Sequence, residues 1–151
     1  MTDPINIITD DDLTDFGACI FHDNALDEYQ KIATKCAIYP GQDSPFGLIY
    51  VALKGAGEAR EFAEHVGKAM RDDNLGMGVE YNEFGSISGD YVKLTPERKE
   101  LLIKEVGDQL WYLAAKCNEL GISLSHTAFE NLKKLADRGA RGKLHGSGDN
   151  R

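Results

Sequence analysis

The chain has 151 residues, of which 42% are hydrophobic and 28% are charged, and it carries a formal net charge of -8 at pH 7. This length and composition predict one globular domain with its own hydrophobic core. The surplus of acidic residues disfavours binding to a nucleic-acid backbone, because neutralising phosphates requires surplus lysine and arginine. It does not exclude a small anionic substrate, since a bound divalent cation can reverse the local charge.

The sequence lacks a long apolar run and the pattern of a secretory signal, so we expect neither a membrane span nor export. The three cysteines are odd in number and lack the CxxC spacing of a zinc site. This argues against a disulfide framework. We therefore expect a cytoplasmic protein.

The spacing of apolar residues predicts an all-α fold, a bundle of about four helices. Residues 1–24 are an acidic lead-in, and a helical domain is expected over 25–151, with helices near 26–37, 46–73, 95–120 and from Ser123 or Ser125 onward. Thr95 followed by Pro96 is typical of a helix start, and Gly121 of a helix end. The glycine-containing stretch 74–94 loses the helical period, so it is expected to be an inserted loop or small β-hairpin.

The middle of the second helix, "GEAREFAEHV", carries Glu58, Glu61 and Glu64 at a spacing of three. Residues three apart are neighbours on a helix, so these like charges repel each other unless water screens them or a cation binds. Glu105 and Asp108 form a second pair with this spacing on the third helix. Each helix therefore offers two carboxylates that point in one direction.

The surroundings of the two pairs differ. The stripe of the third helix that is expected to face the core comprises Leu102, Ile103, Val106, Leu110, Leu113, Cys117 and Leu120. The acids of that helix lie away from the stripe, yet their own face also carries Leu101, Tyr112 and Ala115, with Trp111 at its edge. A solvent-facing surface rarely gathers such residues around two acids. The glutamates of the second helix share their face with charged residues and, taken alone, fit a solvated surface.

A cation would be required if the two pairs faced each other, because four ionised carboxylates cannot crowd together. Oxygen ligands without cysteine or suitably spaced histidine favour Mg²⁺, with Mn²⁺ as a substitute, over zinc. Mg²⁺ usually shares its coordination sphere with substrate phosphates and can hold a water for in-line attack. Glu61 is the first candidate for the base that accepts the proton of this water, and Glu64 is the second.

These segments resemble a known family. "GEAREFAEHVGKAMRDD" and "KEVGDQLWYLAAKCNELG" are similar to the ExxE and ExxD halves of the motif of MazG-type nucleotide pyrophosphohydrolases, in the all-α NTP pyrophosphatase superfamily. The resemblance spans residues 27–151, and the stretch "NLKKLADRGARGKLHGSGDNR" is similar to phage and bacterial MazG-like proteins. It implies magnesium-dependent hydrolysis of a nucleoside or deoxynucleoside triphosphate to the monophosphate and pyrophosphate, by a homodimer or homotetramer.

The resemblance also implies roles for individual residues. All four carboxylates of the two pairs would be metal ligands, directly or through water: Glu58, Glu61, Glu105 and Asp108. Tyr112, and the N-x-x-K match of Asn131 and Lys134, would contact the substrate. The chain departs from the family in the long segment between the two pairs. It also carries Arg60 where many relatives have a small residue, which leaves the orientation of the substrate open.

Further substrate contacts rest on residue type alone. Lys54 and Arg138 are candidates for binding phosphate, although each also fits an ordinary solvated charge. Trp111 would stack on a base or fill a packing contact. The C-terminal "GSGDN" has the glycine content of an anion-binding loop but also fits a flexible end. The histidines at 65, 126 and 145 lack metal-ligand spacing and are interpreted as surface residues.

The sequence therefore predicts a nucleoside triphosphate pyrophosphohydrolase, without indicating which base it prefers. A different class of protein stays open, a non-catalytic helical oligomer that regulates or binds and whose carboxylates form a solvated or metal-stabilised face. A third possibility is a related enzyme that acts on a single nucleotide or on another pyrophosphate-containing metabolite.

Overall fold

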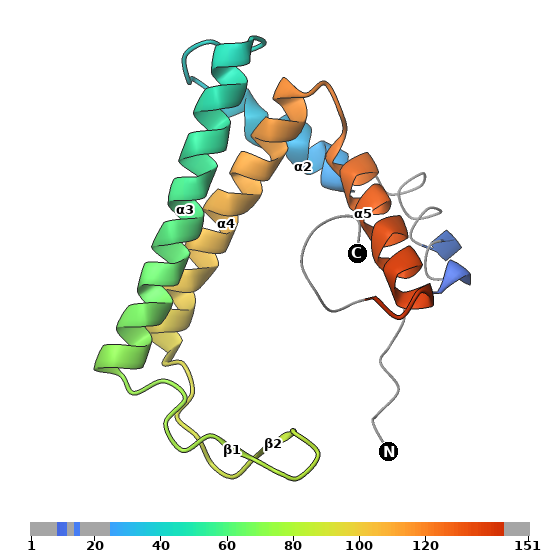
Figure 1. The fold of residues 1–151 in the computed structure, drawn as a ribbon. Helices are drawn as coiled ribbons and strands as arrows, with labels where there is room; N and C mark the ends of the chain where they lie inside the picture. The colour runs from blue at the N-terminus through green and yellow to red at the C-terminus, as the bar shows by residue number, and fades with distance from the viewer. Residues whose placement is uncertain (1–8, 12–13, 16–24, 144–151) are drawn as a thin grey trace. The chain divides into compact units, whose positions relative to one another are not determined.

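The computed structural model describes residues 9–11, 14–15 and 25–143 (Figure 1). Four helices follow each other along residues 25–143, namely α2 (Ala25–Ala33), α3 (Pro45–Asp72), α4 (Pro96–Glu119) and α5 (Leu124–Ala140). The 3-10 turn η1 (Thr34–Cys36) extends α2. The prediction of an all-α fold is confirmed. No helix in the described part of the chain combines the length and apolar character needed to cross a membrane.

The helices begin and end where the local sequence predicts. The Thr95 hydroxyl accepts a hydrogen bond from the Arg98 backbone N–H at 3.2 Å, just before Pro96 opens α4. Gly121 closes the same helix in the left-handed region, with φ +65°. The Ile122 N–H donates back to the Cys117 carbonyl at 3.0 Å, which is the bond that such a glycine cap supplies. Ser123, one of the two predicted starts, caps α5 by accepting from the His126 N–H.

The expected insertion between α3 and α4 contains a small hairpin. Strands β1 (Glu80–Tyr81) and β2 (Ile87–Ser88) pair antiparallel, with Tyr81 opposite Ile87. The turn is held by the Asn82 side chain, which accepts hydrogen bonds from the backbone N–H groups of Phe84 and Ser86. The prediction of a loop or small hairpin at 74–94 is therefore confirmed.

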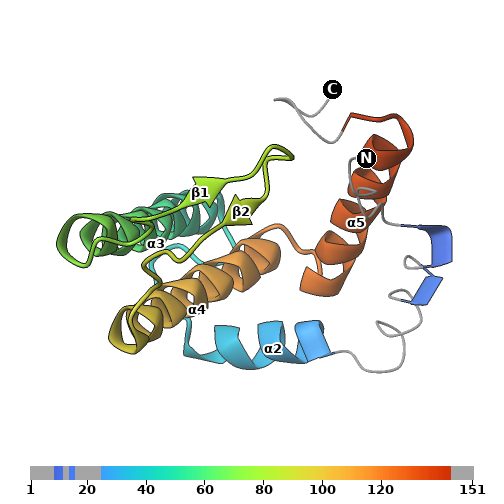
Figure 2. The ribbon, with the colours of Figure 1, turned by 90° about the horizontal axis from the view of Figure 1, so that it is seen from below.

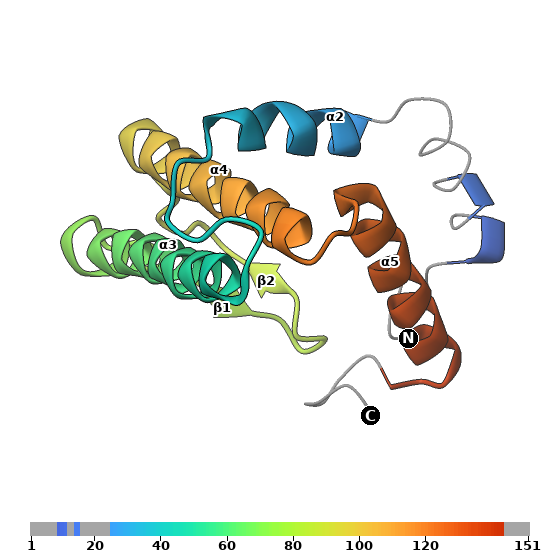
Figure 3. The same cartoon turned by 90° about the horizontal axis from the view of Figure 1, so that it is seen from above.

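The chain divides into two compact units, and one of them is Pro40–Leu113. In this unit α3 and the first part of α4 lie side by side, as the views in Figures 2 and 3 agree. Arg98 ties the starting end of α4 to the C-terminal end of α3, with Nε 2.6 Å from a carboxylate oxygen of Asp73, the residue that follows the helix. A guanidinium nitrogen of Arg98 also lies 3.7 Å from Asp72.

The expected core stripe of the third helix is buried only in part, because Leu102 and Cys117 are buried whereas other members of the stripe are exposed. Ile103 is 60% exposed, and Val106 and Leu113 are also exposed. On α3 the apolar residue Leu53 is 71% exposed, whereas the buried residues are Gly47, Val51, Gly55 and Ala69. Three of those four are glycine or alanine, which let a neighbouring backbone approach closely. The side of the pair that carries the acids is thus an inner side, while several larger apolar residues face outward.

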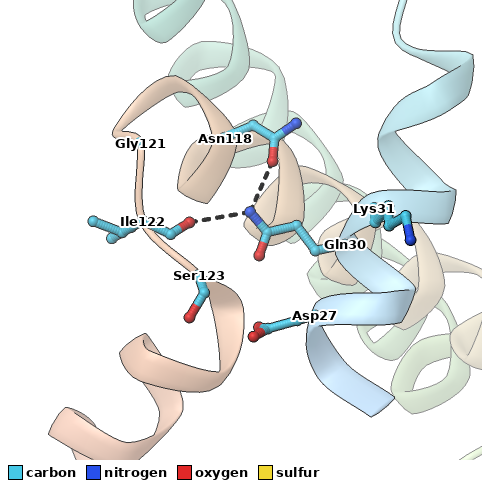
Figure 4. Close-up of a pocket in the computed structure, with 7 residues that line it drawn as sticks. All are labelled: Asp27, Gln30, Lys31, Asn118, Gly121, Ile122 and Ser123. Atoms are coloured by element: carbon cyan, nitrogen blue, oxygen red, sulfur yellow. Dashed lines mark hydrogen bonds between the residues drawn. The ribbon is translucent and has the colours of Figure 1, made fainter. Parts of the chain in front are cut away.

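The other unit combines the chain up to Tyr39 with the chain from Ala114 onward. Here α2 holds the start of α5 through Gln30, which is 8% exposed (Figure 4). Gln30 Nε2 donates to Asn118 Oδ1 at 2.7 Å and to the Ile122 carbonyl at 3.1 Å, while Oε1 accepts from the Leu124 N–H at 2.6 Å. Asp27 accepts two further hydrogen bonds, from the N–H and the hydroxyl of Ser125.

An open pocket of about 330 Å³ lies beside this network. It is lined by Asp27, Gln30, Lys31, Asn118, Gly121, Ile122 and Ser123. The oxygens of Asp27 and the amide of Gln30 are already engaged in holding α5. The pocket is therefore a by-product of the capping contacts.

The network around Gln30 yields a test of stability. Gln30→Leu leaves the buried Leu124 N–H without its acceptor, so we expect the free energy of unfolding to fall by about 1–3 kcal/mol. Urea unfolding followed by circular dichroism measures the change. The control is Lys31→Ala on the same helix, where an exposed ion pair with Glu28 is lost and the change should stay below about 1 kcal/mol. Equal stability of Gln30→Leu and the unaltered chain would show that these hydrogen bonds do not hold α5.

Candidate metal centre

Three carboxylates from two helices meet within the Pro40–Leu113 unit. They belong to Glu58 on α3 and to Glu105 and Asp108 on α4, and each offers an oxygen that lies within 4.8 Å of the other two. The two acids of α4 stand one turn apart on the face that looks toward α3, which is why both reach the same point. Glu58 and Glu105 are half-buried, and Asp108 is exposed.

The electrostatics of this group are unfavourable for three negative charges. Burial raises the pKa of the Glu58 carboxyl above its ordinary value, and the charges of Glu61, Asp108 and Glu105 raise it further. Lys54, one turn earlier on α3, acts in the opposite direction but is the weakest of these influences. The three carboxylates would therefore be stabilised by a positive charge at their meeting point.

The Glu105 side chain shows where a cation would fit. It is only 13% exposed, and its Oε2 atom is buried without a hydrogen-bond partner among the described residues. A buried carboxylate oxygen without a partner is costly. Oxygen donors alone suit a hard divalent cation such as Mg²⁺ or Mn²⁺. The residues present thus fit such an ion.

The other two glutamates of the α3 stripe lie outside this three-carboxylate group. Glu61 is exposed and 3.8 Å from the Arg60 guanidinium. Glu64 pairs with Lys68 and with Arg60, each at 2.9 Å. The hydrogen bond from Lys68, followed by the charge of Lys68 and the contact with Arg60, lowers the pKa of Glu64. Arg60 therefore points toward glutamates of its own helix.

One predicted substrate residue lies next to the group, and a second packs against it. Tyr112 follows Asp108 by one turn, and its pKa is raised by burial and then by the charges of Glu58, Tyr50 and Asp108. Its ring meets the Trp111 ring edge to face, with centroids 4.8 Å apart and an interplanar angle of 88°. Both side chains are half-buried. The tyrosine is thus placed beside the carboxylates, and the tryptophan supports it.

The interpretation of His65 as a surface residue is wrong. Its side chain is only 22% exposed, and its Nε2 atom lies 3.6 Å from Glu105 Oε1. His65 follows Glu58 by seven residues, two helical turns, and this spacing is the signal that places both on one face of α3. The surface interpretation of His126 is confirmed, because that residue is exposed.

The remaining predicted site residues belong to α5 in the other unit. Asn131 and Lys134 are exposed on that helix. Arg138 is 6% exposed, so its interpretation as an ordinary solvated charge is wrong. Residues 144–151, which include the "GSGDN" stretch and His145, lie outside the described residues. The same holds for most of the acidic lead-in, of which residues 10–11 and 14–15 are helical.

Comparison with known proteins finds a clear relative. The chain matches no protein-family model, and no solved structure matches it. The Gene 37 protein of Mycobacterium phage L5 is 40% identical over 129 residues, which are 83% of this chain and 98% of that protein. The name of this relative states no activity. The chain belongs to the same protein family as the Gene 37 protein of Mycobacterium phage L5.

Proposed function

We propose that this protein is a magnesium-dependent nucleoside or deoxynucleoside triphosphate pyrophosphohydrolase of the MazG type, acting in the cytoplasm. The observation that carries the proposal is the meeting of Glu58, Glu105 and Asp108, with a buried Glu105 oxygen that lacks a partner among the described residues. Like charges separate when nothing holds them together, so carboxylates gathered by two helices favour a cation site. The ExxE and ExxD resemblance supports the same function.

The carboxylates of this group would hold the metal. Glu58, Glu105 and Asp108 would contact Mg²⁺ directly, and Glu61 would contact it directly or through water. When bound, Mg²⁺ would neutralise charge on the triphosphate and polarise a phosphoryl oxygen. Tyr112 lies one turn beyond Asp108, where its hydroxyl would contact the substrate.

Glu61 remains the first candidate for the general base. It lies one turn after Glu58 and outside the three-carboxylate group, which leaves it available to accept a proton from water. Glu64 is less suitable, because its contacts with Lys68 and Arg60 lower its pKa. A carboxylate with a lowered pKa is a weaker base. The products would be a nucleoside monophosphate and pyrophosphate.

The other substrate contacts are proposed from the resemblance and from charge. Lys54, exposed one turn before Glu58, would attract the phosphates. Asn131 and Lys134 would contact phosphate or sugar. Arg138, one further turn along α5, would contribute positive charge toward the phosphates. Trp111 would stack on the base or hold Tyr112 in place. The preference for base and sugar would depend on these groups.

The outward apolar residues of α3 and α4 support self-association into a homodimer or homotetramer. Exposed Leu53, Ile103, Val106 and Leu113 are typical of surfaces that a partner covers. The same residues also favour the second candidate function, a non-catalytic helical oligomer that binds or regulates. Enzymatic assays separate the two functions, because only the first requires turnover.

The bond specificity can be tested with a panel of ribonucleoside and deoxynucleoside triphosphates in the presence of Mg²⁺. We expect release of pyrophosphate and the monophosphate, because attack at the α-phosphorus breaks the link to the β-phosphate. Ion-exchange chromatography of the products measures both. Orthophosphate as the direct product would contradict the bond specificity, and no turnover of any triphosphate would favour the non-catalytic oligomer.

The roles of the glutamates can be separated by single substitutions. Glu61→Gln should lower kcat by about 10²-fold to 10⁴-fold, the range for removal of a general base, while Mn²⁺ still raises the melting temperature. Glu58→Gln should abolish both turnover and the stabilisation by Mn²⁺. Glu64→Gln serves as the matched control, with near-normal turnover and stabilisation. A Glu61→Gln variant with normal kcat would disprove the assignment of the base.

The pH dependence of stability tests the electrostatics of the metal-free protein. Because the pKa of Glu58 is raised in the folded state, the stability associated with this group is present below its ordinary pKa of 4.5 and is lost as the pH rises through the folded-state value. In EDTA at pH 7, Glu58→Gln should therefore melt at a higher temperature than the unaltered chain. The difference should vanish toward pH 4, where Glu58 is largely protonated. Thermal scans across this pH range provide the measurement, and a lower melting temperature of the variant at pH 7 would contradict the raised pKa.

A further inference from the structure

His65 and Glu105 form a buried contact between α3 and α4. The distance from His65 Nε2 to Glu105 Oε1 is 3.6 Å, and both side chains are largely shielded from water. His65 shares its face of α3 with Glu58, so it lies on the side from which the metal centre is built. This contact joins a residue without a role in the proposed reaction to one of the three carboxylates.

The imidazole lies next to the carboxylate group without being part of it. Among the described residues, Glu58, Glu105 and Asp108 offer oxygens that all lie within 4.8 Å of one another, and this group does not include His65. The imidazole contacts one oxygen of Glu105, while the other oxygen, Oε2, is buried without a hydrogen-bond partner among the described residues. His65 Nδ1 is likewise buried without a partner there. One carboxylate oxygen thus lies near the imidazole, and the other is left for a different contact.

We propose that His65 is the positioning residue for Glu105, donating from Nε2–H to Oε1 so that Oε2 is presented to a divalent cation. This inference rests on the proposed metal centre. The carboxylates that hold a metal are commonly oriented by hydrogen bonds from a second residue, and loss of that residue typically weakens metal binding. The separation of 3.6 Å is longer than a hydrogen bond. Hydrogen bonds in ligand-free sites are often long and tighten when the ligand binds.

The geometry distinguishes this role from simple packing. A packing residue would need only the volume of the imidazole, whereas a positioning residue needs a donor at the place of Nε2. Glutamine places an amide N–H close to that position, and leucine fills similar space without a donor. The two substitutions therefore separate the two roles.

The experiment measures Mn²⁺ binding to the full chain by electron paramagnetic resonance, without nucleotide. We expect His65→Leu to weaken Mn²⁺ binding by about 10-fold to 100-fold, the usual effect of losing such a partner, and His65→Gln to stay within a few-fold of the unaltered chain. His126→Leu, the same change at an exposed histidine of α5, is the matched control and should bind normally. Circular dichroism in EDTA checks that each variant is folded, and His65→Gln carries the test alone if His65→Leu does not fold.

Three results would overturn the role of His65. Normal Mn²⁺ affinity of a folded His65→Leu would show that the imidazole does not orient Glu105. Affinity lost in His65→Gln would show that a donor at this position does not suffice. With either result, the proposed metal centre still stands if the unaltered chain binds Mn²⁺ and the Glu58→Gln variant does not. Failure of the unaltered chain to bind Mn²⁺ would overturn the proposed metal centre and this inference together.

Discussion

Repulsion among Glu58, Glu105 and Asp108 is the main electrostatic cost that the pairing of α3 and α4 has to overcome. Packing the two helices brings these three carboxylates within 4.8 Å of one another, and burial makes the charge of Glu58 more costly still. The pair is held at its far end by Arg98, which contacts the last residues of α3. Within this unit, helix packing and the ion pairs of Arg98 therefore act against the repulsion among the three carboxylates. A divalent cation bound between the carboxylates would remove this repulsion.

The small residues of α3 explain why the acid-bearing face can be the inner one. A helix wheel assigns the face with the largest apolar side chains to the core, and several residues of this pair depart from that rule. Gly55 and Ala69 are buried on the face that also carries Glu58, while Leu53 and Ile103 are exposed. Small residues on this face leave room for the polar side chains between the two helices, while several bulky apolar side chains lie outside.

The unit containing α2 and α5 is organised by polar contacts. Gln30 uses both its amide nitrogen and its oxygen, and Asp27 uses both its oxygens, to satisfy backbone and side-chain groups at the start of α5. The first N–H groups of a helix lack partners within the helix, so residues from α2 supply what α5 cannot. The direction of α5 relative to α2, and with it the place of Asn131 within this unit, therefore depends on Gln30 and Asp27, about a hundred positions earlier in the chain than the residues they contact.

The sequence by itself determined the helices, their ends and the two carboxylate pairs, because caps such as Thr95 and Gly121 act over a few residues of backbone. It also predicted that Glu105 and Asp108 point in one direction, since a helix fixes the angle between residues three apart. Only the tertiary structure decided which glutamate of α3 joins them, that His65 is a neighbour of Glu105, and that Arg138 is buried. These outcomes depend on how one helix is rotated against another, and that rotation is set by contacts between residues far apart in the chain, which the spacing along one helix does not contain.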